Sequence, residues 1–203
     1  MSGKWIEVES KAHELLTDHK FNQAESFLLQ CLAQFREANE KEDLEYIVGR
    51  LAQFYSMPEM EDRPKADHFY LERENLSKDA HSKLQTATFY FYVLQDFPKT
   101  IAKIDEIGKL RRHVDPDYYS GLSLKGQALI ECDDLQGVSD VLEEMQTMTE
   151  TTRARLPYGD EMNFLERAIS IPRFESKCRR ILATIIPCMR SPEYLVRAKR
   201  LLD

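Results

Sequence analysis

Residue types that carry catalysis occur in this chain, but their spacing forms no known catalytic or metal-binding motif. None of the five histidines belongs to an HExxH pair, the spacing that places two imidazoles on one helix face around zinc. No serine or cysteine nucleophile motif accompanies them, and no glycine-rich loop is present to bind phosphate. The histidines are His13, His19, His68, His81 and His113. We predict a non-enzymatic protein without catalytic, cofactor-binding or metal-binding residues, although a catalytic pair assembled from distant positions would leave no local motif.

The four cysteines form no CxxC pair and have no histidine at ligand spacing. They are Cys31, Cys132, Cys178 and Cys188. We predict small, buried, hydrophobic side chains, with a disulfide between Cys178 and Cys188 as the alternative. Adjacent carboxylates such as Asp133 and Asp134 fall at a predicted helix end, where solvation explains them.

Composition favours a helical protein of the cytoplasm. The chain has 203 residues, of which 42% are hydrophobic and 31% charged, with only 7 Gly and 8 Pro. Scarce glycine disfavours an all-β fold, which needs many tight turns. The longest apolar stretches, such as 89–94, are far shorter than the roughly 20 residues that cross a bilayer. We therefore expect no membrane association and a cytoplasmic location.

Hydrophobic periodicity predicts helices throughout the chain. Capping and proline signals place the boundaries, with Ser77 and Asp115 as helix caps and Pro98 at a first helical position. Segment 86–93 is rich in β-branched and aromatic residues, which favour a strand, but it has no evident partner strand and is predicted as helix. The predicted helices are 2–18, 21–37, 42–57, 64–74, 78–95, 98–112, 116–132, 134–150, 160–169, 172–186 and 192–202.

A recurring spacing of small and bulky residues joins these helices into pairs. It is clearest in Val48, Leu51, Ala52 and Tyr55, followed by Ala66 and Tyr70, and in Leu122, Gly126 and Leu129, followed by Val138 and Leu142. At these residues the chain resembles the tetratricopeptide repeat family, whose helix pairs carry W-x2-L-G-x2-Y and A-x3-F. The small residues Ala24, Ala66, Thr100 and Val138 are separated by 42, 34 and 38 positions, against a family period of 34.

The resemblance implies an all-α fold, a right-handed superhelical stack of antiparallel helix pairs. It predicts a single domain over 1–203, with repeats near 2–38, 42–75, 78–112 and 116–150 and capping helices over 160–203. A non-repeat helical bundle is the alternative. Four positions depart from the family pattern, because Lys11 and Lys125 replace leucine, Thr88 replaces a small residue and Arg73 replaces alanine.

In tetratricopeptide-like stacks, the first helix of each pair lines a concave groove. The resemblance projects into this groove the residues one and four positions beyond each first-helix crossing, namely His13, Leu16, Gln53, Ser56, Phe89, Tyr92, Gln127 and Ile130. Glu9, Gln85 and Glu131 are expected nearby. Amides and aromatics suit an extended peptide, so we predict a protein or peptide partner. Burial of Phe89 and Tyr92 in the core is the alternative for these two rings.

Charge divides the chain into an acidic body and a basic end. Residues 1–172 hold 20 Lys and Arg against 32 Asp and Glu, whereas residues 173–203 hold 8 against 3. A regulatory or nucleic-acid-associated role through this end is the second hypothesis, although net acidity and few aromatics make nucleic acid the less favoured partner. Ion pairing with the acidic body is the simpler explanation. The residues of this candidate patch are Arg173, Lys177, Arg179, Arg180, Arg197 and Arg200.

The last predicted helix carries an apolar stripe beside basic residues. Leu195, Ala198, Leu201 and Leu202 share one face, and Arg197 lies among the residues of the opposite face. We predict that this helix caps the stack, with a homodimer through the C-terminal helices as the alternative.

Overall fold

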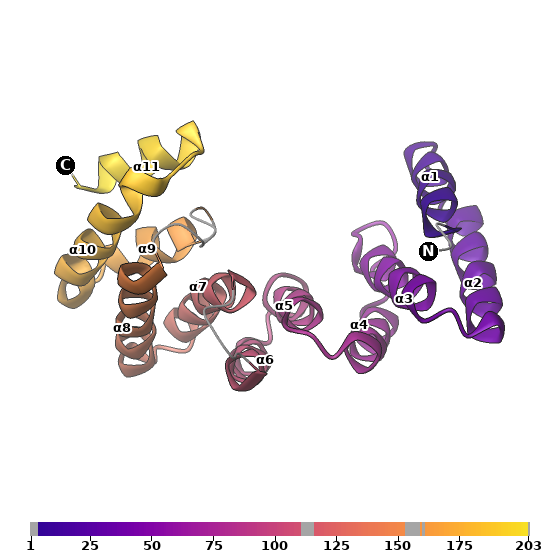
Figure 1. Cartoon of the computed structure of the whole chain (residues 1–203), viewed down its shortest axis with the longest axis horizontal. Helices are drawn as coiled ribbons and strands as arrows, with labels where there is room; N and C mark the ends of the chain where they lie inside the picture. The colour runs from indigo at the N-terminus through magenta and orange to yellow at the C-terminus, as the bar shows by residue number, and fades with distance from the viewer. Residues whose placement is uncertain (1–3, 111–115, 153–158, 160, 203) are drawn as a thin grey trace. The chain divides into compact units, whose positions relative to one another are not determined.

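A computed structural model describes residues 4–110, 116–152, 159 and 161–202 (Figure 1). All regular structure in these residues is helical, which confirms the predicted all-α class. The chain divides into two compact units, residues 1–82 and residues 83–203, and each is described by itself. The single repeat domain over 1–203 and the right-handed superhelix stay predictions.

The first unit contains two antiparallel helix pairs. The pairs are α1 (Lys4–Thr17) with α2 (Phe21–Ala38) and α3 (Lys41–Ser56) with α4 (Arg63–Ser77). Helix α3 is central, because it packs against α1, α2 and α4. Its Ile47, Leu51, Phe54 and Tyr55 are almost fully buried. Burial raises the pKa of Tyr55 to about 12, and its hydroxyl donates to Glu25 at 2.6 Å.

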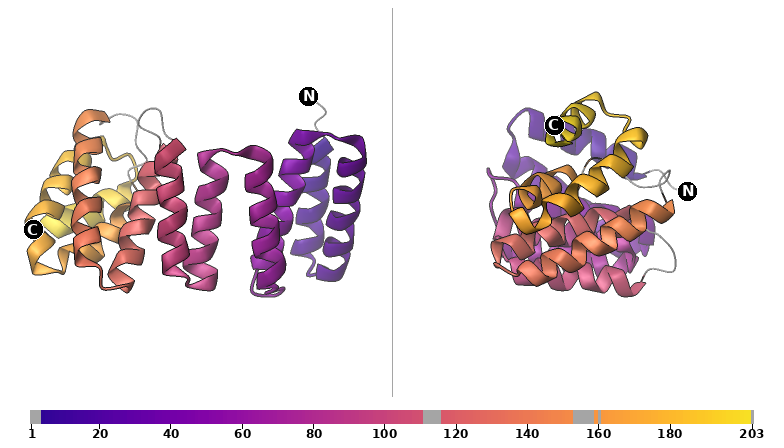
Figure 2. Two further views of the ribbon diagram at one scale, coloured as in Figure 1. Left: turned by 90° about the horizontal axis from the view of Figure 1, so that it is seen from below. Right: turned by 90° about the vertical axis from the view of Figure 1, so that its left-hand side faces the viewer.

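The second unit continues with further helix pairs that lie side by side (Figure 2). The α-helices are α5 (Ala80–Phe89), α6 (Phe97–Leu110), α7 (Pro116–Glu131), α8 (Leu135–Thr152), α9 (Glu161–Ile169), α10 (Glu175–Ile185) and α11 (Pro192–Leu202). Helix α7 packs against α6, α8 and α9, and α10 packs against α8, α9 and α11. Helices α5, α7 and α9 therefore occupy one side of this unit, and α6, α8 and α10 the other (Figure 1).

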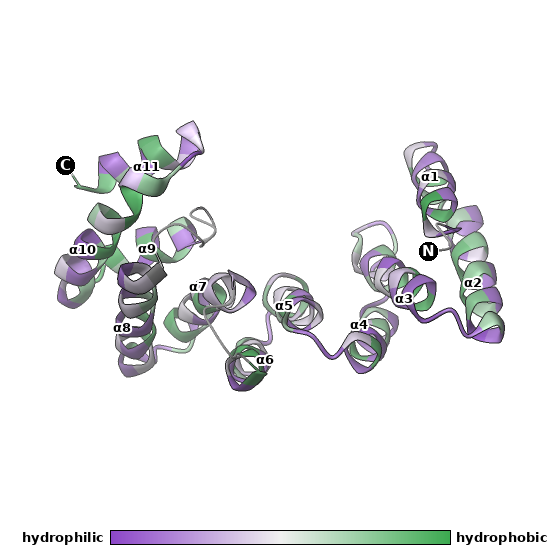
Figure 3. Ribbon diagram, in the orientation of Figure 1, coloured by the Kyte–Doolittle hydropathy of each residue, from purple (hydrophilic) through white to green (hydrophobic). Residues whose placement is uncertain are grey.

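Amphipathic sequences explain this packing. In Figure 3, apolar and polar residues lie on different sides of helices such as α6. The small residues that defined the repeat spacing lie at the buried crossings, since Ala24, Ala52, Ala66, Thr100 and Val138 are 0% exposed. A Cβ on Gly126 of α7 would lie 2.4 Å from the Phe164 ring of α9. Glycine at this position thus permits the close approach of the two helices.

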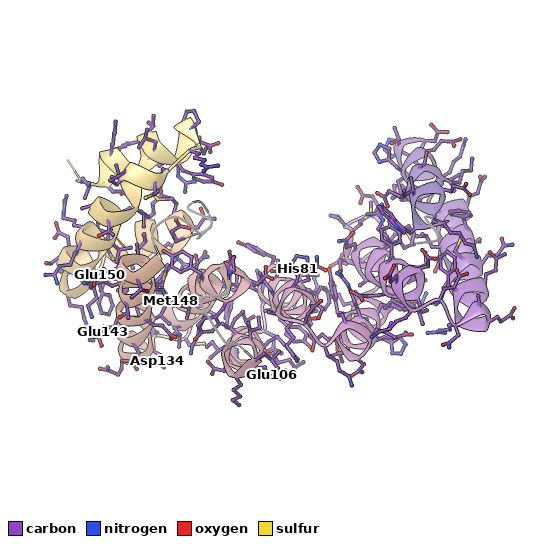
Figure 4. The ribbon with its side chains drawn as sticks, in the orientation of Figure 1. His81, Glu106, Asp134, Glu143, Met148 and Glu150 are labelled. Carbon is purple, nitrogen blue, oxygen red and sulfur yellow. The ribbon has the colours of Figure 1, made fainter. Side chains whose placement is uncertain are left out.

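Aspartates begin four of the helices, as their carboxylates accept the backbone N–H groups that a helix start leaves unbonded. The pairs are Asp62 with Lys65 (3.2 Å), Asp79 with Ser82 (2.7 Å), Asp96 with Lys99 (3.1 Å) and Asp134 with Gly137 (2.9 Å). Asp134, at the start of α8, is labelled in Figure 4. The prediction that Ser77 caps a helix is wrong: Ser77 ends α4, its hydroxyl donates to the Arg73 carbonyl, and Asp79 supplies the cap.

Two predicted helices are not uniform. Segment 86–93 is helical as expected, but α5 ends at Phe89 and continues as a π-helix, η1 (Tyr90–Leu94). The predicted helix 172–186 divides into a 3-10 turn, η2 (Pro172–Phe174), and α10, and a second 3-10 turn, η3 (Ile186–Cys188), follows. Pro98 is the second residue of α6, not the first. Some predicted features lie outside the described residues, namely the helix cap Asp115, the residue His113, and the helix ends near residues 2 and 112.

Candidate functional site

The second unit has a hollow of about 180 Å³ on the side formed by α5, α7 and α9. It is lined by Leu84 and Thr88 from α5, Tyr92 from η1, Ser120, Ser123, Leu124 and Gln127 from α7, and Asn163 from α9. No lining side chain is charged. We call these residues the unit 2 hollow.

The π-helix determines where Tyr92 lies. Leu84, Thr88 and Tyr92 recur every fourth residue and share one face, and the wider i to i+5 turns of η1 carry this face to the end of the helix. Gln95 then takes a left-handed conformation (φ 54°), and the Asp96 N–H bonds the Tyr90 carbonyl at 2.9 Å. Tyr92 is 58% exposed, unusually high for an aromatic residue. Its ring meets the buried Phe91 ring edge to face, with centroids 4.9 Å apart.

An ion pair orients the amide of Asn163. The Arg197 guanidinium of α11 donates to both oxygens of Glu166, at 2.8 and 2.6 Å, and to Asn163 Oδ1 at 3.0 Å. The hydrogen bonds from Arg197 lower the pKa of Glu166, which therefore remains charged at neutral pH. Because Asn163 Oδ1 accepts from Arg197, its NH₂ group is left to donate to a ligand.

Gln127 contributes the complementary group. Its Nε2 is directed at the Ser123 carbonyl at 3.5 Å, which leaves its Oε1 to accept a hydrogen bond. The hollow therefore presents an amide donor, an amide acceptor, an aromatic ring and the apolar side chains of Leu84 and Leu124. These groups can hydrogen-bond a peptide backbone and hold a neutral side chain.

The predicted groove residues are only partly brought together. Tyr92 and Gln127 line the unit 2 hollow. Gln85 is half-buried on α5 and does not line it. Glu131 is exposed and pairs with Arg167 at 2.6 Å. His13 and Gln53 belong to the first unit, where both are exposed and Gln53 accepts from Arg50 at 3.0 Å.

The placement of Phe89 in the groove is wrong. Phe89 is 2% exposed and belongs to the interior, as the alternative held. The first-helix crossing in this pair is Ala87, at 0% exposure, and not Thr88. Thr88 lies one position beyond Ala87 and lines the hollow. Sequence reasoning missed Thr88 and Asn163, although the alanine before Thr88 was a usable signal.

Most of the predicted basic patch is engaged within the chain. Lys177 pairs with Glu143 of α8 at 2.7 Å, and Arg179 pairs with Glu175 at 3.0 Å. Glu143 is labelled in Figure 4. Arg173 donates to the Leu135 carbonyl and lies over the Phe174 ring, and Arg197 binds Glu166. Arg180 and Arg200 are exposed. Ion pairing with the acidic body thus accounts for two of the six residues, Lys177 and Arg197, whereas the partner of Arg179 belongs to the basic end itself.

The cysteines form no disulfide within the described residues. Cys31 and Cys178 are buried as predicted. Cys132 is exposed and Cys188 is half-buried, so the prediction of buried side chains is wrong for these two. Burial raises the pKa of the Cys178 thiol to about 12, which keeps it protonated. No group of three or more His, Cys, Asp or Glu suited to a metal ion occurs in the described part of the chain.

Comparisons with known proteins point to the fold alone. No family model matches the sequence, and no curated protein matches it. The crystal structure of PilW, a widely conserved type IV pilus biogenesis factor, is similar, with a TM-score of 0.56 and 13% sequence identity over 95% of this chain and 81% of that one. None of the helices described here is long and apolar enough to cross a membrane. The chain has an all-helical fold similar to that of PilW, and this likeness supports a helical repeat.

Proposed function

We propose that this protein is a non-enzymatic interaction module that binds an extended segment of a partner protein in the unit 2 hollow. The observation that carries the proposal is the exposed Tyr92 ring beside two amide side chains, Gln127 and Asn163. Tyrosine is enriched at the energetic centres of protein interfaces because it offers a large apolar area and a polar hydroxyl.

The size and polarity of the hollow support a peptide over a small molecule. Its volume of about 180 Å³ is below the roughly 300–1,000 Å³ of typical small-molecule pockets, and it suits one or two side chains. Asn163 as donor and Gln127 as acceptor complement the C=O and N–H groups of an extended backbone. Since the lining carries no charge, the bound side chains are neutral.

Selection from a random-sequence peptide library against the full chain tests this proposal. For a selected peptide, Tyr92→Ala should weaken the affinity at least about tenfold, as expected for loss of a central aromatic contact. Leu110→Ala is the matched control, since Leu110 is a 47% exposed apolar residue of α6 outside the hollow. The Leu110→Ala variant should bind the selected peptide with the same affinity as the unmodified chain.

Thermal melting of the same variants separates binding from folding. Because Tyr92 is 58% exposed, Tyr92→Ala should barely change the melting temperature. Selected peptides that bind the Tyr92→Ala and unmodified proteins equally would contradict the proposal. A large loss of stability with unchanged peptide affinity would also contradict it, because the ring would then serve the core.

A further inference from the structure

The first unit contains a second hollow, of about 280 Å³, with a different chemical lining. Trp5 of α1, Glu42, Glu45 and Tyr46 of α3, and Arg73 of α4 surround it. We call these residues the unit 1 hollow. It shares no residue with the unit 2 hollow, so an inference about it stands independently of the proposed function.

Two aromatic rings form one wall of this hollow. Trp5 and Tyr46 lie with ring centroids 5.2 Å apart and planes inclined at 41°. Trp5 is 42% exposed, so much of its indole is accessible. The Tyr46 hydroxyl donates to Glu9, which fixes the ring, and burial raises the pKa of Tyr46 so that it stays neutral. Aromatic faces carry negative electrostatic potential and attract cations.

Two carboxylates face the same space without a cationic partner. Glu42 and Glu45 are three residues apart on the first turns of α3, and Glu42 and Tyr46 are four apart, which places all three on one helix face. Within the described residues, neither carboxylate forms an ion pair. The neighbouring Glu9 is different, because it is already engaged with Arg50 at 3.0 Å.

Arg73 lies against helix α3. Its Cδ, Nε and Cζ atoms lie 3.1–3.2 Å from where a Cβ on Gly49 would stand, so the guanidinium rests against the bare backbone of α3. Its Nε is buried and has no hydrogen-bond partner among the described residues. Arg73 offsets one of the two carboxylates of the lining, and the hollow keeps a single net negative charge.

We propose that the unit 1 hollow binds one arginine side chain of a partner protein. A guanidinium stacks on aromatic faces and donates hydrogen bonds to carboxylates at its edge, whereas the compact ammonium of lysine is more strongly hydrated and matches this lining less well. The single net negative charge complements one monovalent cation. The exposed indole and the two unpaired carboxylates supply the stacking surface and the hydrogen-bond acceptors.

The only tryptophan of the chain, Trp5, lies in this hollow, so intrinsic fluorescence reports its occupation directly. The full chain is titrated with the blocked tripeptide acetyl-Gly-Arg-Gly-amide and, separately, with acetyl-Gly-Glu-Gly-amide. The arginine peptide should change the fluorescence saturably in about the millimolar range, as expected for a single side-chain contact. The glutamate peptide should give no saturable change.

Variants assign the response to the hollow. The double substitution Glu42→Gln and Glu45→Gln should lower the affinity for the arginine peptide at least tenfold. Glu59→Gln should leave this affinity unchanged, because Glu59 is an exposed glutamate of the 57–62 loop. Tyr92→Ala should also leave this titration unchanged, which keeps the test separate from that of the unit 2 hollow. The melting temperature of each variant verifies that it is folded.

Three outcomes would overturn the proposal. The first is the absence of a saturable response to the arginine peptide. The second is a response that the double glutamine variant leaves intact. The third is saturable binding of the glutamate peptide that Arg73→Gln abolishes, which would make this hollow an anion site.

Discussion

The two hollows differ in charge although both are formed on antiparallel helix pairs. The unit 1 hollow combines two glutamates, an arginine and two aromatic rings, whereas the unit 2 hollow has neutral amides, hydroxyls, leucines and one tyrosine. The helix framework therefore positions side chains without determining their chemistry. A partner that contacts both would need an arginine for the first and an uncharged stretch for the second.

The two units also differ in how tightly their helices cross. In the second unit, a Cβ added to Gly126 would lie 2.4 Å from the rigid Phe164 ring. In the first unit, a Cβ added to Gly49 would lie 3.1 Å from the flexible Arg73 side chain. A rigid aromatic neighbour cannot yield, but the end of an arginine side chain can move into the hollow beside it.

The largest expected effect follows from this contrast. Gly126→Ala should destabilise the second unit by about 1–3 kcal/mol, because the added methyl forces α7 and α9 apart. Gly49→Ala should cost the first unit less, since Arg73 can shift and alanine favours the helix by about 1 kcal/mol over glycine. Native-state hydrogen exchange measures each unit separately, which a single melting curve does not.

Equal losses of protection for the two variants would contradict the difference in crossing. Gly108→Ala in α6 provides an intermediate case within the second unit, as its added Cβ would lie 3.0 Å from the Tyr118 ring. The loss of hydrogen-exchange protection in Gly108→Ala should fall between the losses in Gly126→Ala and Gly49→Ala.

A smaller effect concerns the orientation of Asn163. Arg197→Gln should lower the affinity for a library-selected peptide about two- to tenfold, because the Asn163 amide loses the hydrogen bond that directs its NH₂ group. Arg180→Gln is the control, since Arg180 is an exposed arginine that forms no ion pair in the described part of the chain. Isothermal titration of the two variants with one peptide gives the comparison. Peptide affinity unchanged in Arg197→Gln would show that Asn163 needs no orientation by Arg197.

Much of the fold followed from sequence because its signal is local. Small residues at fixed spacing marked the helix crossings, and the structure buries Ala52 and Gly126 there. The η1 segment was not predictable in the same way, because a π-helix has the same hydrophobic residues as an α-helix and differs only in hydrogen bonding. Tyr92 lies in this segment and lines the unit 2 hollow, whereas the misplacement of Phe89 came from taking Thr88 and not Ala87 as the helix crossing.

One residue of the unit 1 hollow, Arg73, stands where the repeat pattern has alanine. Thr88 is not a departure of this kind, because it lies one position beyond the buried Ala87 and there lines the unit 2 hollow. Asn163 could not be found, because its orientation depends on Arg197, which is 34 residues away along the chain. Such long-range pairs leave no periodic trace in one sequence.

The smallest expected effect is the pH dependence of the Arg197–Glu166 pair in the second unit. The pKa of Glu166 is lowered from its ordinary value of 4.5, chiefly by hydrogen bonds from Arg197. A depressed carboxyl pKa contributes stability that is complete above the unfolded value and is lost as pH falls through the folded value. Arg197→Gln should therefore melt slightly below the unmodified protein at pH 7, and the two melting temperatures should converge below pH 4.5. Since both side chains are about one-third exposed, the difference should stay small and shrink with added salt. A melting difference that persists at low pH would mean that Arg197 stabilises the unit by packing and not by its charge.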